Sequence, residues 1–201
     1  MMKYIYRFFT ALVVSICLIS CANLNNSQAN WQTLFDSNSN LNQFSQVGEA
    51  NWRIENGILT ADLLKGKNAA FLTTQKTYKD FELYAEVWVD SDTNSGFFVR
   101  CDSPSNIGAD TCYEFNIWDA RPDPTYGTGA IVNTAKVSPM PLAGGRWNTF
   151  EISVKGDQLI FKMNGQVTSS AVDKKHAQGG VIGLQYGSGI VKIKKVLIKP
   201  I

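Results

Sequence analysis

The chain has 201 residues, of which 44% are hydrophobic and 11% aromatic, and its formal net charge at pH 7 is +2. This length and apolar content suffice for one sizeable core and favour a single domain. Positive charges are mixed with Asp and Glu along the chain, without the basic block of a nucleic-acid-binding surface. We therefore expect one domain and no nucleic-acid partner.

The first 20 residues are typical of an export signal. Lys3 and Arg7 precede an apolar run over residues 8–19, which is too short for an anchored membrane span. The run leads into Leu-Ile-Ser-Cys21, which resembles the lipobox of bacterial lipoproteins, whose cysteine takes a diacylglycerol and becomes the first mature residue. The alternative is an ordinary signal with an incidental cysteine.

The residues after Cys21 predict where the mature protein resides. Ala22, in place of Asp, resembles lipoproteins sent to the outer membrane. Acyl chains on Cys21 would hold the protein at a membrane surface without a spanning helix. We expect a lipoprotein signal peptide in residues 1–20, a polar tether in 21–30 and one domain in 31–201, lipid-anchored in the bacterial cell envelope, at the outer membrane.

Short strands are predicted from the start of this domain. Apolar runs indicate strands over residues 31–36 and 69–73, and Asn-Gly between two runs in residues 52–61 indicates a hairpin turn. In residues 81–90 every second residue is apolar, which predicts a strand with one face in the core. The other face carries carboxylates and aromatic rings, namely Glu82, Tyr84, Glu86 and Trp88.

Residues 94–119 combine aromatic, charged and cysteine residues more densely than any other stretch. Two runs rich in β-branched and aromatic residues flank a polar loop at 102–111, which predicts a β-hairpin. Because strand side chains alternate between two faces, Phe97, Val99 and Tyr113 are expected in the core. The residues expected on the open face are Gly96, Phe98, Arg100, Glu114, Asn116 and Trp118. Aromatic rings cover the apolar face of a sugar and polar side chains bind its hydroxyls, so this face suits a carbohydrate.

Cys101 and Cys112 flank the hairpin loop and are the cysteines left in the exported domain. In an oxidising compartment they are expected to form a disulfide. The alternation, however, places Cys101 on the core side and Cys112 on the open side, where a regular hairpin would not let them bridge. Either one of them lies beyond the regular ladder or one face assignment is wrong.

The rest of the chain continues the pattern of short strands. Residues 120–129 are predicted to form a loop at the rim of the open face, and His176, the only histidine, is expected in an exposed loop. Further strands are predicted over residues 128–137, 147–154, 158–163, 166–171, 181–186 and 190–198, with a turn at Asn164-Gly165. About a dozen strands spaced by ~10 residues predict an all-β, antiparallel two-sheet sandwich.

An ordered set of segments resembles a known family. They are Asp80-Phe81-Glu82-Leu83, Asn94-Ser95-Gly96, Tyr113-Glu114-Phe115-Asn116-Ile117, Thr128-Gly129-Ala130-Ile131, Gly145-Arg146-Trp147-Asn148-Thr149, Asn164-Gly165 and Ile182-Gly183-Leu184-Gln185. The chain resembles, over residues 31–201, the 3-keto-disaccharide hydrolase domain family, formerly a bacterial domain of unknown function. The resemblance implies a two-sheet jelly roll of the concanavalin A-like lectin/glucanase type that cleaves glycosides oxidised at C3.

Such cleavage needs particular groups. A C3 ketone acidifies the C2 proton, so a carboxylate base can start elimination of the C1 substituent, with water added later. Glu114 is the candidate base or acid, Arg100 the clamp for the enolate oxygen, and Glu86 or Asp119 a second carboxylate. The structural alternatives are that Glu86 is a solvated strand residue, that Asp119 caps a turn and that Arg100 only pairs with Glu114.

Other residues are candidates for binding the sugar. They are Asn94, Phe98, Asn116, Trp118, Gln185 and Tyr186. Many relatives read Gln-Asp-His-Gly where this chain has Gln185-Tyr186-Gly187-Ser188, so no histidine is expected to bind a metal or act as a base here. No cofactor is predicted with certainty, and a divalent metal held only by carboxylates stays open.

Two functions from different classes follow. One is an exported, lipid-anchored hydrolase or lyase acting on 3-keto-glycosides, and the other is a non-catalytic carbohydrate-binding lipoprotein with the same cleft. A purely structural surface protein is a third alternative, because a sandwich fold does not imply a function. The feature that discriminates the first two is a pair of carboxyl groups converging in the cleft, which ordinary glycosidases place roughly 5 to 10 Å apart.

Overall fold

Antiparallel strands form two layers in residues 30–201, the part of the chain that the computed structural model describes. The predicted signal peptide, the lipidation of Cys21 and the tether up to residue 29 lie outside the described residues. Trp31–Ile201 form one unit. No helix within residues 30–201 has the length and apolar character needed to cross a membrane.

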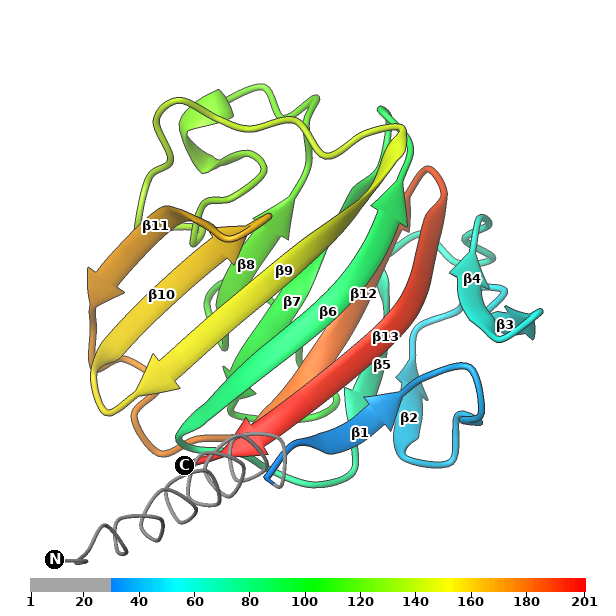
Figure 1. Cartoon of the computed structure of the whole chain (residues 1–201), viewed down its shortest axis with the longest axis horizontal. Helices are drawn as coiled ribbons and strands as arrows, with labels where there is room; N and C mark the ends of the chain where they lie inside the picture. The colour runs from blue at the N-terminus through cyan, green and yellow to red at the C-terminus, as the bar shows by residue number, and fades with distance from the viewer. Residues whose placement is uncertain (1–29) are drawn as a thin grey trace, which may run out of the picture. The chain divides into compact units, whose positions relative to one another are not determined.

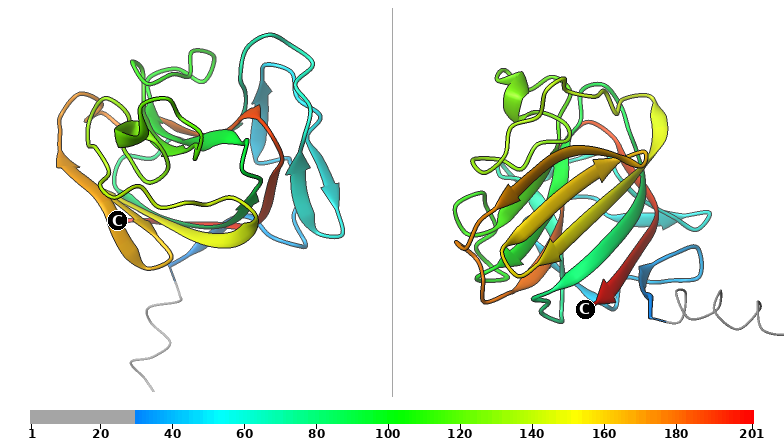
Figure 2. Two further views of the ribbon diagram at one scale, coloured as in Figure 1. Left: turned by 90° about the horizontal axis from the view of Figure 1, so that it is seen from above. Right: turned by 60° about the vertical axis from the view of Figure 1, so that its left-hand side comes forward.

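The larger layer is an eight-stranded sheet. In spatial order its strands are β11 (Gln166–Val172), β10 (Gln158–Met163), β9 (Arg146–Lys155), β6 (Phe81–Val89), β13 (Val191–Pro200), β4 (Ile58–Ala61) and β3 (Arg53–Glu55), with β1 (Gln32–Phe35) also paired to β13. The five-stranded sheet has the order β2 (Phe44–Val47), β5 (Ala70–Thr74), β12 (Val181–Ser188), β7 (Asn94–Cys101) and β8 (Tyr113–Ile117). The two sheets face each other (Figures 1 and 2). The predicted all-β, two-sheet antiparallel sandwich is therefore confirmed.

Alternation of side chains builds the core between the sheets. Along β6 buried and half-buried residues alternate without a break, as the sequence pattern predicted. Phe97 and Phe115 of the five-stranded sheet point inward and meet the rings of Phe150 and Phe161 of the other sheet, at centroid distances of 6.1 Å for Phe97–Phe150 and 5.2 Å for Phe115–Phe161. Such aromatic pairs contribute about 0.5–1.5 kcal/mol each beyond the area they bury.

Turn chemistry fixes the hairpins. Asn56 and Gly57 have φ angles of 52° and 75°, the left-handed values that a two-residue turn between β3 and β4 requires. Asn164 and Gly165, with φ of 51° and 77°, make the same kind of turn between β10 and β11. Both predicted Asn-Gly turns are confirmed.

The predicted strand over residues 128–137 is wrong. This segment makes only isolated bridges, between Ile131 and Phe115 and between Ile131 and Ala135. The backbone N–H of Asn116 donates to the Ala130 carbonyl at 3.0 Å, and that of Val132 donates to the Glu114 carbonyl at 2.9 Å. The segment therefore covers the free edge of β8 without extending the ladder.

A bulge in β7 overturns the predicted orientation of Arg100. The register between β7 and β12 shifts by one residue at this point, and Arg100 has a φ of 51°. Its side chain is fully buried and does not face Glu114. The guanidinium donates to the Lys79 carbonyl at 2.7 Å, the Gly156 carbonyl at 2.9 Å and the Asp80 carboxylate at 2.8 Å. Arg100 thus ties together three loop residues and lies outside the open face.

The same bulge resolves the conflict over the cysteines. Because Arg100 takes the extra position, Cys101 moves from the core side to the outer face, where Cys112 lies. The two cysteines form a disulfide with a Cα–Cα distance of 4.3 Å. The predicted pairing is confirmed, and the face assigned to Cys101 was wrong.

Reduction of this disulfide is expected to destabilise the domain. The bond closes a loop across a sequence separation of 11, which is worth about 3 kcal/mol in the chain-entropy model. The melting temperature of protein purified from an oxidising compartment should therefore fall when reductant is added. A Cys101→Ser/Cys112→Ser double variant serves as the control, since reductant should leave its melting temperature unchanged. Two free thiols in the untreated protein would contradict the prediction.

His176 is buried, with 4% of its surface exposed, so its predicted placement in an exposed loop is wrong. Its ring packs edge-on against Tyr113 at 4.9 Å, and its Nδ1 lies 3.3 Å from the Asp102 carboxylate. The Tyr113 hydroxyl accepts from the His176 N–H and donates to Asp173 at 2.6 Å. Within the polar segment 173–178 only His176 is buried, and the Tyr113 hydroxyl provides this segment with two hydrogen bonds.

Candidate functional site

Two rows of side chains cross the outer face of the five-stranded sheet. Strand register aligns Ser45, Thr73, Gly183, Phe98 and Glu114 in one row. The next row is Val47, Phe71, Gln185, Gly96 and Asn116. The outward position of Phe98, Glu114 and Asn116 agrees with the alternation read from the sequence.

Four residues of these rows form the floor of a cavity of about 490 Å³. The floor contributes Phe71, Phe98, Glu114 and Gln185, and two walls rise beside it. One wall is made of Val47, Gly48, Asn68 and Ala69, and the other of residues 105–109 from the hairpin loop. A volume of this size lies within the roughly 300–1,000 Å³ of small-molecule sites.

Glu114 is the ionisable side chain on the cavity lining. It lies directly opposite Phe98 and retains 8% exposure. Within residues 30–201 its carboxyl group makes no hydrogen bond, and burial raises its pKa from 4.5 to about 7, with the charge of Arg121 opposing the shift. A carboxyl group in this state can both accept and donate a proton near neutral pH, as a general acid or base must.

Two amide oxygens beside Glu114 lack partners. The Oε1 of Gln185 and the Oδ1 of Asn116 are buried and have no hydrogen bond among the described residues. Gln185 lines the cavity, whereas Asn116 is fully buried and its amide nitrogen donates to the Tyr126 carbonyl at 2.7 Å. Gly96 separates the two in the same row. The free Gln185 oxygen can accept a hydroxyl proton from a bound ligand.

The structure separates the predicted carboxylates. Glu86 lies on the outer face of the eight-stranded sheet, where Lys194 and Lys195 approach it at 3.8 and 3.6 Å. Asp119 accepts from Thr128 at 2.6 Å and from the backbone N–H groups of Ala143 and Gly144 at 2.9 and 2.8 Å. Neither side chain lines the cavity with Glu114. The predicted second carboxylate is therefore not provided by Glu86 or Asp119, because one belongs to the other sheet and the other fastens loops.

The remaining sequence-predicted ligand residues lie in different places. Phe98 and Gln185 line the cavity, but Asn94, at the start of β7, and Trp118, just after β8, do not. Arg121 covers the Trp118 ring at 5.4 Å. Tyr186 faces the core, with its ring 6.2 Å from that of Trp52 and its hydroxyl bonded to the Gly189 carbonyl at 2.8 Å. Its prediction as a ligand residue is wrong, because it neighbours Gln185 and so points to the opposite face.

The described residues do not fit a carboxylate metal site. Residues 30–201 contain no group of three or more His, Cys, Asp or Glu side chains arranged to hold a metal ion. Glu86, Asp119 and Glu114 belong to three separate regions of the domain. The cavity therefore offers proton transfer through Glu114 rather than a set of metal ligands.

Sequence reasoning missed both walls of the cavity and part of its floor. Phe71 follows the alternation of β5, which could have assigned it to the outer face. Residues 105–109 were recognised only as a loop, and nothing in their composition indicates that they fold over the sheet. The disulfide at the base of this loop was the one available signal.

Comparison with known proteins gives the family. The description of the family model that matches residues 30–199 is 3-keto-alpha-glucoside-1,2-lyase-like domain. No curated protein was found to match the chain.

Solved structures of similar fold include two putative glycosyl hydrolases from Parabacteroides distasonis. One is 16% identical with a TM-score of 0.72, covering 87% of this chain and 95% of its own. The other is 22% identical with a TM-score of 0.69, covering 85% and 99%. The carbohydrate binding module CBM66 from Bacillus subtilis is 10% identical with a TM-score of 0.57, covering 84% and 98%. These likenesses show the shared fold, and the match over residues 30–199 shows that the chain belongs to the 3-keto-alpha-glucoside-1,2-lyase-like domain family.

Proposed function

We propose that this protein cleaves glycosides oxidised at C3, in the cavity on the outer face of the five-stranded sheet. The observation that carries the proposal is Glu114, a buried carboxyl group with a pKa near 7 at a cavity of small-ligand size. Membership of the family and the fold shared with putative glycosyl hydrolases and a carbohydrate binding module support a carbohydrate-related function.

One carboxyl group suffices for this chemistry. Ionised Glu114 takes the C2 proton, and the C2–H electrons pass into the C3 carbonyl to give an enolate. The enolate then re-forms the ketone, so that the C1–C2 double bond forms as the C1–O bond breaks. The protonated carboxyl then returns the proton to the departing oxygen, which leaves as an alcohol, and water later adds across the double bond. A direct glycosidic hydrolysis needs two carboxyl groups in the cleft, and among residues 30–201 only Glu114 supplies one to the lining of this cavity.

The enolate oxygen must be held by neutral donors in this site. Arg100, predicted for that task, is bonded elsewhere, and no Lys, Arg or His among residues 30–201 lines the cavity. Asn68, Ser105 and Asn106, whose side chains carry neutral hydrogen-bond donors, do line it. Hydrogen bonds from such groups stabilise a developing oxyanion when they are fixed in advance.

The test is product analysis with a 3-keto-glucoside beside its parent glucoside. The protein should release the leaving alcohol from the keto form only, and in heavy water the released keto sugar should carry deuterium at C2, because hydration of the double bond takes that proton from the solvent. Cleavage of the parent glucoside at a similar rate, or cleavage of the keto form without deuterium at C2 of the product, would contradict the elimination. A chelator should leave the rate unchanged.

A non-catalytic carbohydrate-binding role is the second candidate. The specific observation in its favour is that, among the described residues, a single ionisable group lines the cavity. This alternative predicts binding of the parent sugar with no release of alcohol and no deuterium at C2.

We further propose that the protein is exported and held at the outer membrane by lipid on Cys21. The full-length protein should fractionate with membranes, and Cys21→Ser should not be lipidated and should appear in the soluble fraction, because the acyl chains are the only anchor predicted. Metabolic labelling with a fatty acid measures this directly, with Cys17→Ser as the matched control that keeps its label. A labelled Cys21→Ser variant would rule out the lipobox.

A further inference from the structure

The hairpin loop folds over one end of the outer face. Ile107 packs against the outer-face cluster that Phe71, Phe98 and Val181 form with the disulfide-bonded Cys101 and Cys112. A Cβ atom placed on Gly183 would lie 3.6 Å from the Ile107 side chain. Phe98 is only 2% exposed although it points away from the core, since this loop covers it.

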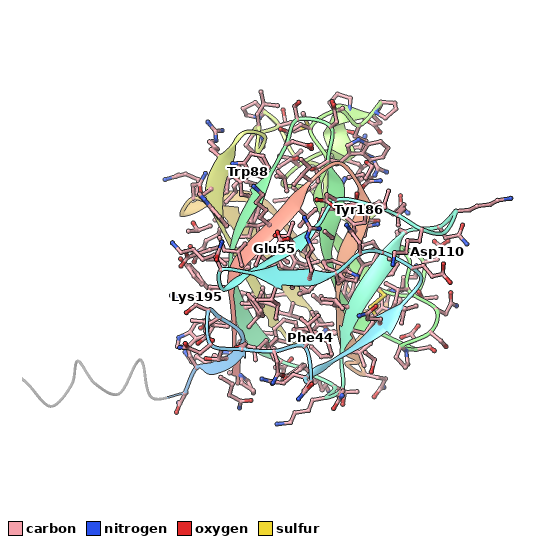
Figure 3. The ribbon with its side chains drawn as sticks, turned by 90° about the vertical axis from the view of Figure 1, so that its right-hand side faces the viewer. Phe44, Glu55, Trp88, Asp110, Tyr186 and Lys195 are labelled. Atoms are coloured by element: carbon pink, nitrogen blue, oxygen red, sulfur yellow. A yellow bond between two sulfur atoms is a disulfide. The ribbon has the colours of Figure 1, made fainter. Side chains whose placement is uncertain are left out.

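The loop is held in place by bonds of its own. The disulfide closes its base, and the Asp102 N–H donates to the Thr111 carbonyl at 3.1 Å. The Thr111 hydroxyl donates to the Asn106 carbonyl at 2.7 Å, and the Thr111 N–H donates to the Gly108 carbonyl at 3.0 Å. Asp110 of this loop lies on the opposite side of the sandwich from Trp88 and Lys195 of the larger sheet (Figure 3). The wall is therefore a fixed part of the outer face of the five-stranded sheet.

The residues along β12 show which end of the cavity the hairpin loop covers. Val181 belongs to the cluster under the loop, Gly183 is touched by Ile107, and Gln185 opens to the cavity. Successive rows are roughly 7 Å apart along a strand. Glu114 shares the row of Gly183 and Phe98, at the edge of the covered region. Ile107 thus borders the row of the sheet that carries Glu114.

We propose that Ile107, held in place by the loop that the disulfide closes, is a specificity-determining residue. It makes the cavity bind the end of a sugar chain and not an internal stretch of it. A terminal unit or a small glycoside reaches Glu114, whereas an internal stretch of a long glycan has to continue past Ile107 and is rejected. The inference rests on the proposed carbohydrate function of the cavity. The cavity volume of about 490 Å³ suits a small ligand and is too small for a long polysaccharide segment.

The first measurement compares a linear with a cyclic glucan of the same linkage and length. Maltohexaose has chain ends and α-cyclodextrin has none, so the wild-type protein should bind maltohexaose at least about tenfold more tightly by calorimetry. Ile107→Ala should reduce that ratio to near one by admitting the cyclic ligand. Val172→Ala, a change of an exposed residue on β11, is the control and should keep the wild-type ratio.

The outcomes separate this inference from the proposed function. Equal binding of the two ligands by the wild-type protein, or an unchanged ratio in Ile107→Ala, overturns the role of Ile107 and leaves the carbohydrate function standing. Failure of both ligands, and of a 3-keto-glucoside and its parent glucoside beside them, to bind at all counts against the carbohydrate function and the inference together.

A second measurement needs no ligand. If Ile107 closes the end of the cavity where Glu114 lies, Ile107→Ala lets water reach the carboxyl group and its pKa should fall from about 7 by about one unit or more. Titration of ¹³C-labelled glutamate by NMR follows the group directly, with Glu114→Gln identifying its signal. An unchanged pKa in Ile107→Ala would show that another element closes the site.

Discussion

Glu114→Gln is expected to lower turnover of a 3-keto-glucoside by roughly 10²-fold or more while binding of the sugar survives. The amide keeps the shape of the carboxyl group and can still hydrogen-bond, but it cannot take the C2 proton. Steady-state kinetics should therefore show a loss in kcat with KM little changed. Glu86→Gln, on the outer face of the other sheet, is the matched control and should leave both parameters unchanged.

The same variant is expected to be more stable than the wild type above pH 7. The Glu114 pKa is raised in the folded state, from 4.5 to about 7, so the folded protein holds this proton more tightly than the unfolded chain. Below pH 4.5 the Glu114 carboxyl group is protonated in both the folded and the unfolded protein, so it does not affect the free energy of unfolding. As the pH rises from 4.5 to about 7 the unfolded chain loses this proton first, and the folded protein becomes less stable. The cost in the wild type reaches about 3 kcal/mol above pH 7, and Gln, which does not ionise, removes it.

Urea unfolding of both proteins at pH 4 and pH 8 measures this difference. The gain from Glu114→Gln should be present at pH 8 and absent at pH 4. A variant that loses stability at pH 8 would place Glu114 among structural residues, as would one that keeps full turnover.

Arg100→Met is expected to destabilise the fold by about 3 kcal/mol or more, because it removes a buried cation from three hydrogen bonds. The Lys79 and Gly156 carbonyls lose a donor and Asp80 loses its counter-ion. Neither Arg nor Met favours the left-handed φ of 51° at this position, so the comparison holds the backbone cost nearly constant.

Arg53→Met is the matched control for this loss. Arg53 pairs with Glu55 and Asp62 at the surface, where solvent screens an ion pair and its contribution to stability is small. Chemical denaturation should therefore separate the two variants clearly. Under conditions where Arg100→Met is folded it should turn over substrate at the wild-type rate, since Arg100 does not reach the cavity. A stable but inactive Arg100→Met variant would show that Arg100 belongs to the functional site.

Local pattern predicted most of the strands for a simple reason. The side-chain period of two and the Asn-Gly turns depend only on residues that are close in the sequence. The sequence therefore predicted the buried face of β6 and the turns at Asn56 and Asn164. The disulfide partners also followed from local sequence and the expected compartment. The segment 128–137 failed because its β-branched residues make an isolated bridge to β8, a distant contact that no local pattern reports.

The candidate site was likewise predictable only where it depends on local sequence. The sequence by itself determined that Phe98 and Glu114 share an outward face, because the alternation in β7 and β8 fixes it up to the bulge. Only the tertiary structure decided the role of Arg100, since one left-handed residue reverses every later side chain on that strand and turned the expected clamp into a core ion pair. It also decided that Glu86 and Asp119 lie away from Glu114 and that Ile107 lines the same cavity as Glu114, because these depend on which sheet each strand joins and where a loop folds back. Burial, which raises the pKa of Glu114, is a property of that assembled cavity and not of the five residues Tyr-Glu-Phe-Asn-Ile around it.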